Sequence, residues 1–162
     1  MTYMADIKMG HVEGPGHGKM IPLAADQYFH RLGGHFVDLD STGAAVLCAS
    51  DSTEIYGWAI APKHAAGYDS WKGSATAKAD SVFVIIGLED HYLVPMESAS
   101  ASANATILAG GMVPYVTGST YTTKQIARYN STAASNLLDI YDFDADNQTC
   151  IVGIRPTKKA QV

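Results

Sequence analysis

The stretch Asp80-Ser-Val-Phe-Val-Ile-Ile-Gly-Leu-Glu-Asp-His-Tyr-Leu-Val-Pro-Met96 decides how the rest of the chain is interpreted. Its two segments rich in β-branched and aromatic residues flank a short turn-forming centre, which predicts a β-hairpin. Val82 to Ile86 is apolar at every position, so we expect this strand to be covered on both faces. Gly87 to Asp90 would form the turn, and Tyr92 to Val94 the return strand. A helix is the alternative, but the apolar run is short, β-branched and closed by Gly and Pro.

Outward from this stretch, short apolar segments separated by turn residues predict about nine strands in all, and hence an all-β sandwich or barrel. The other expected strands are His35 to Asp40, Ala44 to Ala49, Glu54 to Ala61, Met112 to Thr117, Thr120 to Arg128, Leu137 to Phe143 and Thr149 to Arg155. The last two bracket Asp144-Ala-Asp-Asn147, whose side chains can bond their own backbone, so they form a second expected hairpin.

The inward-facing apolar positions of these strands give the expected core. Its members are Val82, Val84, Ile86, Leu93, Trp58, Ile60, Leu138, Ile140, Ile151 and Val152.

The domain organisation predicted from the pattern is an extended, glycine-rich arm over residues 1–34, one β domain over 35–156 and a short tail over 157–162. We expect Gly10 to Gly18 to hold neither a helix nor a packed strand, because each glycine adds backbone entropy that is lost on ordering. Leu23 to Leu32 is compatible with a short helix.

Two insertions interrupt the expected strands. Lys63 to Lys78 is predicted to be a long loop that carries the aromatic residues Tyr68 and Trp71. Glu97 to Ala105 consists almost wholly of small residues, which is typical of a flexible loop. The alternative for this second segment is a flat strand packed on another chain.

Composition narrows the classes of function. Charged residues make up 17% of the 162 residues, below the usual share of about 25%, which favours oligomerisation or docking on a partner. The net charge of −5 disfavours binding to nucleic acid, because phosphates require a basic face. The sequence has neither a membrane-length apolar run nor the layout of a signal peptide, so we expect no membrane partner and synthesis in a cytoplasm.

The two cysteines, Cys48 and Cys150, lie in apolar strand-like segments, and buried free thiols are favoured over a disulfide. The three Asn-x-Ser/Thr matches, at Asn104, Asn130 and Asn147, are interpreted as chance in a chain with no secretory signal.

Motifs for catalysis or metal binding are weak. Asp142 to Asn147 begins like a calcium loop but has Asn147 and Gly153 where an EF-hand needs Gly and Glu. The six histidines show no zinc-motif spacing, and there is no nucleophile elbow or phosphate loop. We therefore expect no cofactor, no metal and no enzyme. A hydrolase with dispersed residues would have to use Asp38, Asp40, His35 and His91.

Four segments carry a resemblance to a known class of proteins. They are Tyr56-Gly-Trp-Ala-Ile-Ala-Pro62, Val84-Ile-Ile-Gly-Leu-Glu-Asp-His-Tyr-Leu-Val-Pro95, Ile107-Leu-Ala-Gly-Gly-Met-Val-Pro-Tyr-Val116 and Val152-Gly-Ile-Arg-Pro156. In these segments the chain resembles the small β-rich head proteins of tailed bacteriophages, the decoration or cement proteins that bind the outside of a capsid. The resemblance implies a virion protein made in the host cytoplasm, often a homotrimer, with the major capsid protein as its partner.

Two functions follow as expectations. The first is a viral structural protein that stabilises contacts between capsomers. The second is a β-sandwich binding module for a small ligand or glycan, in which Trp58, Trp71 or Tyr68 could stack on sugar rings. For the first function, the residues expected to contact a partner are Met4, Met9, His11, Val12, Met20, Tyr68 and Trp71.

Overall fold

The computed structural model describes residues 10–30, 33–62, 70–97, 111–117, 124–130 and 136–161. These residues form an all-β fold, as the sequence predicts, with one short 3-10 turn, η3 (Pro156–Lys158), near the end of the described part. Its strands are β1 (Gly10–Glu13), β2 (Gly18–Pro22), β3 (Tyr28–His30), β4 (Gly34–Leu39), β5 (Ala45–Leu47), β6 (Gly57–Ile60), β7 (Ser70–Lys72), β8 (Ser81–Ile85), β9 (His91–Pro95), β10 (Gly111–Thr117), β11 (Lys124–Asn130), β12 (Leu138–Asp144) and β13 (Thr149–Ile154).

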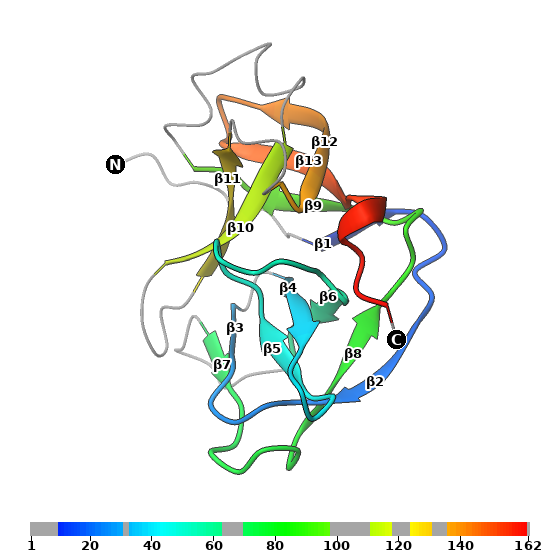
Figure 1. The fold of residues 1–162 in the computed structure, drawn as a ribbon. Coiled ribbons are helices and arrows are strands. Elements are labelled where there is room, and N and C mark those ends of the chain that lie inside the picture. The colour runs from blue at the N-terminus through cyan, green and yellow to red at the C-terminus, as the bar shows by residue number, and fades with distance from the viewer. Residues whose placement is uncertain are drawn as a thin grey trace.

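The strands form two main antiparallel sheets and a small third one (Figure 1). The six-stranded sheet has the order β1-β9-β13-β12-β10-β11, the five-stranded sheet the order β2-β8-β6-β4-β5, and β3 pairs with β7. The six-stranded sheet curls towards closure, because Met96, just after β9, bridges Ala127 of β11 and Glu97 N–H donates to the Ala127 carbonyl at 2.9 Å. The result is a half-barrel packed against the five-stranded sheet.

The expected central hairpin is wrong, although both of its strands exist. β8 pairs with β2 and β6 in the five-stranded sheet, whereas β9 pairs with β1 and β13 in the six-stranded sheet. The segment 86–90 is therefore a corner between the two sheets. Each of β8 and β9 pairs with two strands from other parts of the chain, and they do not pair with each other. β8 is also not covered along both faces, since Phe83 is 37% exposed.

The second expected hairpin is confirmed. β12 and β13 pair antiparallel from Leu138 opposite Ile154 to Asp144 opposite Thr149. The Asp144 carboxylate accepts the backbone N–H groups of Asp146 and Asn147, each at 3.0 Å, so the turn forms by the side-chain bonding that its sequence predicts.

The expectation that Gly10 to Gly18 cannot hold a packed strand is wrong. β1 pairs with β9 and β2 pairs with β8, so this segment contributes an edge strand to each main sheet. Glycine permits the close contact instead of preventing it: a Cβ on Gly18 would lie 2.1 Å from the Val84 carbonyl oxygen. The domain limits at residues 34 and 156 stay predictions.

The expected helix over residues 23–32 is also wrong where the chain is described, because β3 forms there. Its partner β7 lies inside the segment expected to be a long loop. Phe29 of β3 is fully buried, and its ring lies 6.2 Å from that of Trp71 on β7. Cross-strand aromatic contact between two distant segments stabilises this pair, and no local pattern predicts it.

Two apolar clusters lie on the two faces of the five-stranded sheet. The first fills the space between the main sheets, where the rings of Phe36, Trp58 and Tyr92 lie with centroids 4.8 to 5.3 Å apart. The second contains Phe29 and Val84 and lies on the opposite face. Aromatic packing at these separations adds to the stabilisation from burial alone.

The expected core is confirmed for half of its members: Trp58, Val82, Val84, Leu138 and Val152 are buried. It is wrong for Ile60, which is 43% exposed. Four residues are only half-buried, namely Ile86, Leu93, Ile140 and Ile151.

One side chain connects the two main sheets through hydrogen bonds. Gln125 of β11 accepts the Phe36 N–H at 2.7 Å and donates to the carbonyl oxygens of Phe36 at 3.0 Å and Cys48 at 2.9 Å. Gln125 is 6% exposed, so these bonds lie in the interior. They join the half-barrel to the backbone of the five-stranded sheet.

Neither cysteine forms a disulfide and both are buried, as the sequence predicts. Burial raises the pKa of Cys48 above its ordinary value and raises that of Cys150 to about 12. The thiolate is the reactive form of cysteine, and a raised pKa keeps both thiols protonated at neutral pH. Both side chains therefore act as small apolar groups.

His35 is held neutral by its surroundings. Its ring stacks on Phe29 with centroids 5.5 Å apart, its Nδ1 donates to the Tyr28 carbonyl oxygen at 3.2 Å, and its Nε2 accepts the His30 N–H at 3.4 Å. Burial, together with the charge of His30, lowers the pKa of His35 from 6.5 to about 3.

The free energy of unfolding should therefore fall as the pH is lowered below 6.5. In the unfolded chain His35 is protonated below this pH, whereas in the folded chain it stays neutral down to about pH 3. Between about pH 7 and pH 5 this amounts to about 2 kcal/mol. Denaturant unfolding at both pH values should show a smaller pH dependence for His35→Gln than for the wild type. His17→Gln, at an exposed histidine, is the matched control and should retain the wild-type dependence. Identical pH dependence in His35→Gln and wild type would contradict this account.

Candidate binding surfaces and the Asp90 network

An apolar row crosses three neighbouring strands of the five-stranded sheet. Met20 of β2 lies directly opposite Phe83 of β8. The pairing of Trp58 with Ile85 and of Ala59 with Val84, continued by one residue, places Ile60 beside Phe83. The three side chains are 59%, 37% and 43% exposed, respectively. They lie on the same face of the sheet as the buried pair Trp58 and Ile85, just beyond the edge of the half-barrel. We call Met20, Phe83 and Ile60 the apolar row.

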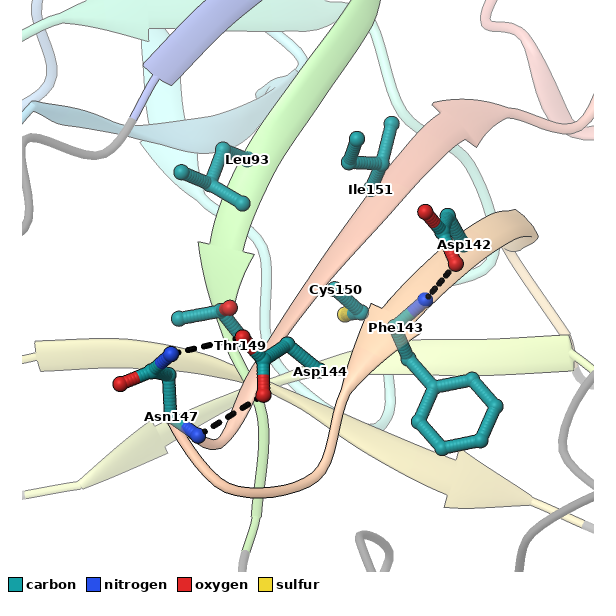
Figure 2. Close-up of a pocket in the computed structure, with 8 residues that line it drawn as sticks. All are labelled: Leu93, Asp142, Phe143, Asp144, Asn147, Thr149, Cys150 and Ile151. Atoms are coloured by element: carbon teal, nitrogen blue, oxygen red, sulfur yellow. Dashed lines mark hydrogen bonds between the residues drawn. The ribbon is translucent and has the colours of Figure 1, made fainter.

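A groove of about 310 Å³ lies over the parts of β9, β13 and β12 that are next to the β12–β13 turn (Figure 2). Leu93 and Ile151, opposite each other in register, form its apolar part. Figure 2 shows the Asp144 to Asn147 turn at one end of the groove and Asp142 above the strand. The complete lining is Leu93, Asp142, Phe143, Asp144, Asn147, Thr149, Cys150 and Ile151.

The same outer face carries an aromatic contact next to the groove. The rings of His91 and Tyr141 stack with centroids 4.0 Å apart, and Tyr141 remains 54% exposed. Gly153 of the intervening strand permits this contact, because a Cβ there would lie 2.9 Å from Tyr141 Cε2. Glu13 lies on the other side, with its carboxylate 3.1 Å from His91 Nδ1.

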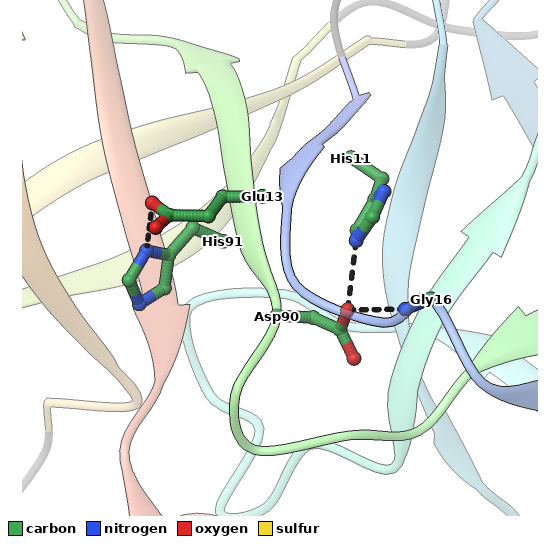
Figure 3. A network of polar contacts seen from close by, with 5 residues as sticks. All are labelled: His11, Glu13, Gly16, Asp90 and His91. Atoms are coloured by element: carbon green, nitrogen blue, oxygen red, sulfur yellow. Dashed lines mark hydrogen bonds and ion pairs between the residues drawn. The ribbon is translucent and has the colours of Figure 1, made fainter.

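The corner between β8 and β9 contains a buried carboxylate (Figure 3). Asp90 is fully buried, and its Oδ1 accepts hydrogen bonds from His11 Nε2 and from the Gly16 N–H, both at 2.7 Å. Its Oδ2 has no partner among the described residues. A Cβ on Gly14 would lie 2.6 Å from Asp90 Oδ1, so glycine is needed for the loop to reach the carboxylate.

This corner lies against the connection between β1 and β2. In Figure 1 the blue connection and the green one run side by side along one flank, and the Ile86 N–H donates to the His17 carbonyl at 3.0 Å. The Asp90 charge also contributes, after burial, to raising the pKa of Tyr92. A deeply buried charge with one imidazole partner makes the position of the first strand depend on this contact.

Four of the seven residues expected to contact a partner are described, and they lie at different places in the fold. Met4, Met9 and Tyr68 lie outside the described residues. Met20 belongs to the apolar row, and Val12 is 50% exposed on the edge strand β1. The other two have structural contacts: His11 bonds Asp90, and Trp71 packs against Phe29.

The residues considered for a dispersed hydrolase each have a structural role. His35 is buried beside Phe29, His91 pairs with Glu13, and Asp40 accepts bonds from Thr42 within its own turn. Asp38 accepts the N–H of the next residue, Leu39, and its pKa is raised, mainly by burial. Trp58, 2% exposed, is closed to a sugar.

Within the part of the chain that the structure describes, no three His, Cys, Asp or Glu side chains are grouped as a metal site. No described helix has the length and apolar character needed to cross a membrane. Comparison of the chain with protein-family models, with curated proteins and with solved structures finds no match.

Sequence reasoning missed the apolar row and the Asp90 network. The row depends on the register between strands that are far apart in the chain. The sequence places Asp90 in a turn, and the available signal for its burial is the pair of glycines at positions 14 and 16: Gly14 allows a close approach to the carboxylate, and both glycines have a positive φ.

Replacing His11 by Ala should destabilise the fold by about 2 kcal/mol, because it leaves a buried carboxylate without its side-chain partner. Chemical denaturation measures this loss. Glu13→Ala is the matched control: it breaks the second histidine–carboxylate pair of the same strand, but Glu13 is 74% exposed, so the loss should stay below about 1 kcal/mol. Equal losses in the two variants would contradict the special role of Asp90.

Proposed function

We propose that this chain is a viral structural protein that binds the outer surface of a capsid, with the major capsid protein as its partner and with self-association into a homotrimer. The observation that carries the proposal is the apolar row. Three large apolar side chains, Met20, Phe83 and Ile60, are exposed side by side on a sheet whose other face is covered. Contiguous exposed apolar groups mark interaction surfaces more often than scattered ones do.

The shape and chemistry of this surface suit docking on a rigid shell. The row lies on paired strands, so its side chains are held in place before binding and lose little conformational entropy. Met20 has an unbranched, adaptable side chain that suits an irregular partner surface. The low charged content of 17% and the resemblance of four segments to phage head proteins support the same function.

The geometry also favours a second function, a binding module for a small ligand or glycan. The observation is the groove of about 310 Å³ with the exposed Tyr141 next to it. An aromatic face, an aliphatic floor of Leu93 and Ile151, and the acceptors of Asp142 and Asn147 match the alternating apolar and hydroxyl surfaces of a sugar.

The capsid function predicts that the protein co-fractionates with assembled shells. In density-gradient fractionation of the native source, mass spectrometry should find it in the fraction that holds the major capsid protein. Recombinant protein added back to stripped shells should sediment with them, and Phe83→Ser should weaken this binding at least tenfold, because it places a polar group in the apolar contact.

Tyr141→Ala is the matched control, since it removes an exposed aromatic ring from the other sheet, and it should bind shells like the wild type. Exclusion of the protein from the shell fraction would overturn the capsid function. Binding to immobilised glycans that is lost in Tyr141→Ala and retained in Phe83→Ser would establish the second function instead.

A further inference from the structure

Residues 10–22 form a strap that lies along one edge of each main sheet. β1 ends the six-stranded sheet beside β9, and β2 ends the five-stranded sheet beside β8. Most side chains of the strap are exposed, and Ile21 is its one large apolar side chain in the buried core. Its attachment therefore rests mainly on backbone pairing and on the Asp90 network.

The strap has a defined end at Leu23. This residue is 1% exposed, its N–H donates to the Asp80 carbonyl at 2.8 Å, and its carbonyl accepts the Lys78 N–H at 2.7 Å. Leu23 is thus fixed in the body of the fold. Residues 10–22 contribute only Ile21 to the buried apolar clusters, and His11 contacts them through Tyr92, with ring centroids 5.9 Å apart.

The contact that holds the strap is a polar latch. His11 and the Gly16 N–H both bond one oxygen of the fully buried Asp90. Among the described residues, the strap also carries Glu13 and His17, the corner carries Glu89, and β9 carries His91 and Tyr92. Glu13 and His91 pair with each other on the outer face, whereas the side chain of His11 is hydrogen-bonded to Asp90 (Figure 3).

We propose that the strap is exchanged between copies of this chain, so that residues 10–22 of one copy pair with β8 and β9 of a second copy, and that the His11–Asp90 contact is the latch that retains the strap on its own copy. A detached strap exposes two sheet edges, each with unpaired backbone N–H and C=O groups. The segment that fits both edges in register, with His11 and Gly16 placed for Asp90, is the same segment of another copy. This proposal does not depend on capsid binding.

Two variants that each carry one added cysteine, Glu13→Cys and His91→Cys, test the exchange. The two positions lie opposite each other in the pairing of β1 with β9, on the outer face. The variants are mixed at high concentration, incubated and oxidised with diamide, and mass spectrometry identifies the disulfide. A disulfide between positions 13 and 91 then joins two different copies, which requires the β1 of one copy to lie on the β9 of the other. The native cysteines are buried and do not compete.

The control mixture is Asp51→Cys with His91→Cys, because Asp51 is exposed and lies in the turn between β5 and β6. Exchange predicts a yield of the 13–91 disulfide several times that of the 51–91 disulfide. Equal yields at every protein concentration would overturn the exchange.

The latch is tested in the same assay. Adding His11→Ala to both variants should raise the initial rate at which the 13–91 disulfide forms, because the contact is remade on the second copy and its loss lowers only the barrier to detachment. Adding Asp90→Asn as well should lower this rate again, because the uncompensated buried charge is removed while Gly16 keeps an acceptor. Merely lost packing would not be rescued by Asp90→Asn. If His11→Ala does not fold by circular dichroism, His11→Gln takes its place. An initial rate unchanged by the loss of His11 would overturn the latch.

Discussion

The hydrogen bonds of Gln125 hold the two halves of the molecule in one arrangement. Two sheets packed through apolar side chains alone can slide, because dispersion and hydrophobic contacts have little directional preference. The Gln125 amide fixes their relative position, since it pairs with the N–H and C=O of Phe36 and with the C=O of Cys48 in the interior. Displacement of either sheet would leave these buried groups unpaired, at a cost of about 1 to 3 kcal/mol for each group.

Asp90 acts similarly at the flank of the molecule. The corner between β8 and β9 and the connection between β1 and β2 each pass from one sheet to the other, and they do so side by side (Figure 1). The buried carboxylate joins these two crossings through His11 and Gly16. Gln125 in the interior and Asp90 at the flank are thus two buried polar side chains that specify how the strands connect. The apolar clusters stabilise the packed sheets but do not specify one arrangement.

The sequence predicted the class of fold and the positions of most strands, because β-branched residues and turn residues act locally. The β12–β13 hairpin was predictable for the same reason, since Asp144 and Asn147 close the turn within a few residues. Strand partners were not predictable. Val82 to Ile86 and Tyr92 to Val94 have the same local pattern whether they pair with each other or enter different sheets, and only the distant strands β2, β6 and β13 decide between the two.

The binding surfaces follow from the same topology. The apolar row exists because β2, β8 and β6 are neighbours, and the groove exists because β9 and β12 flank β13. The sequence predicts Met20 as a partner contact, Ile60 as a core residue and Phe83 as part of a strand covered on both faces, because strand periodicity does not reveal where a covering sheet ends. The two surfaces lie on different sheets, so they can be changed independently.

The most direct test of the central role of Gln125 is the free energy of unfolding of Gln125→Leu, measured together with Gln161→Leu at an exposed glutamine. Leucine keeps the volume close to that of glutamine and removes all three hydrogen bonds. The account predicts that Gln125→Leu loses about 3 kcal/mol and that the Phe36 amide exchanges its hydrogen faster, while Gln161→Leu changes stability by less than about 0.5 kcal/mol. Equal stability of the two variants would contradict it, because the sheets would then be held in place by apolar packing alone.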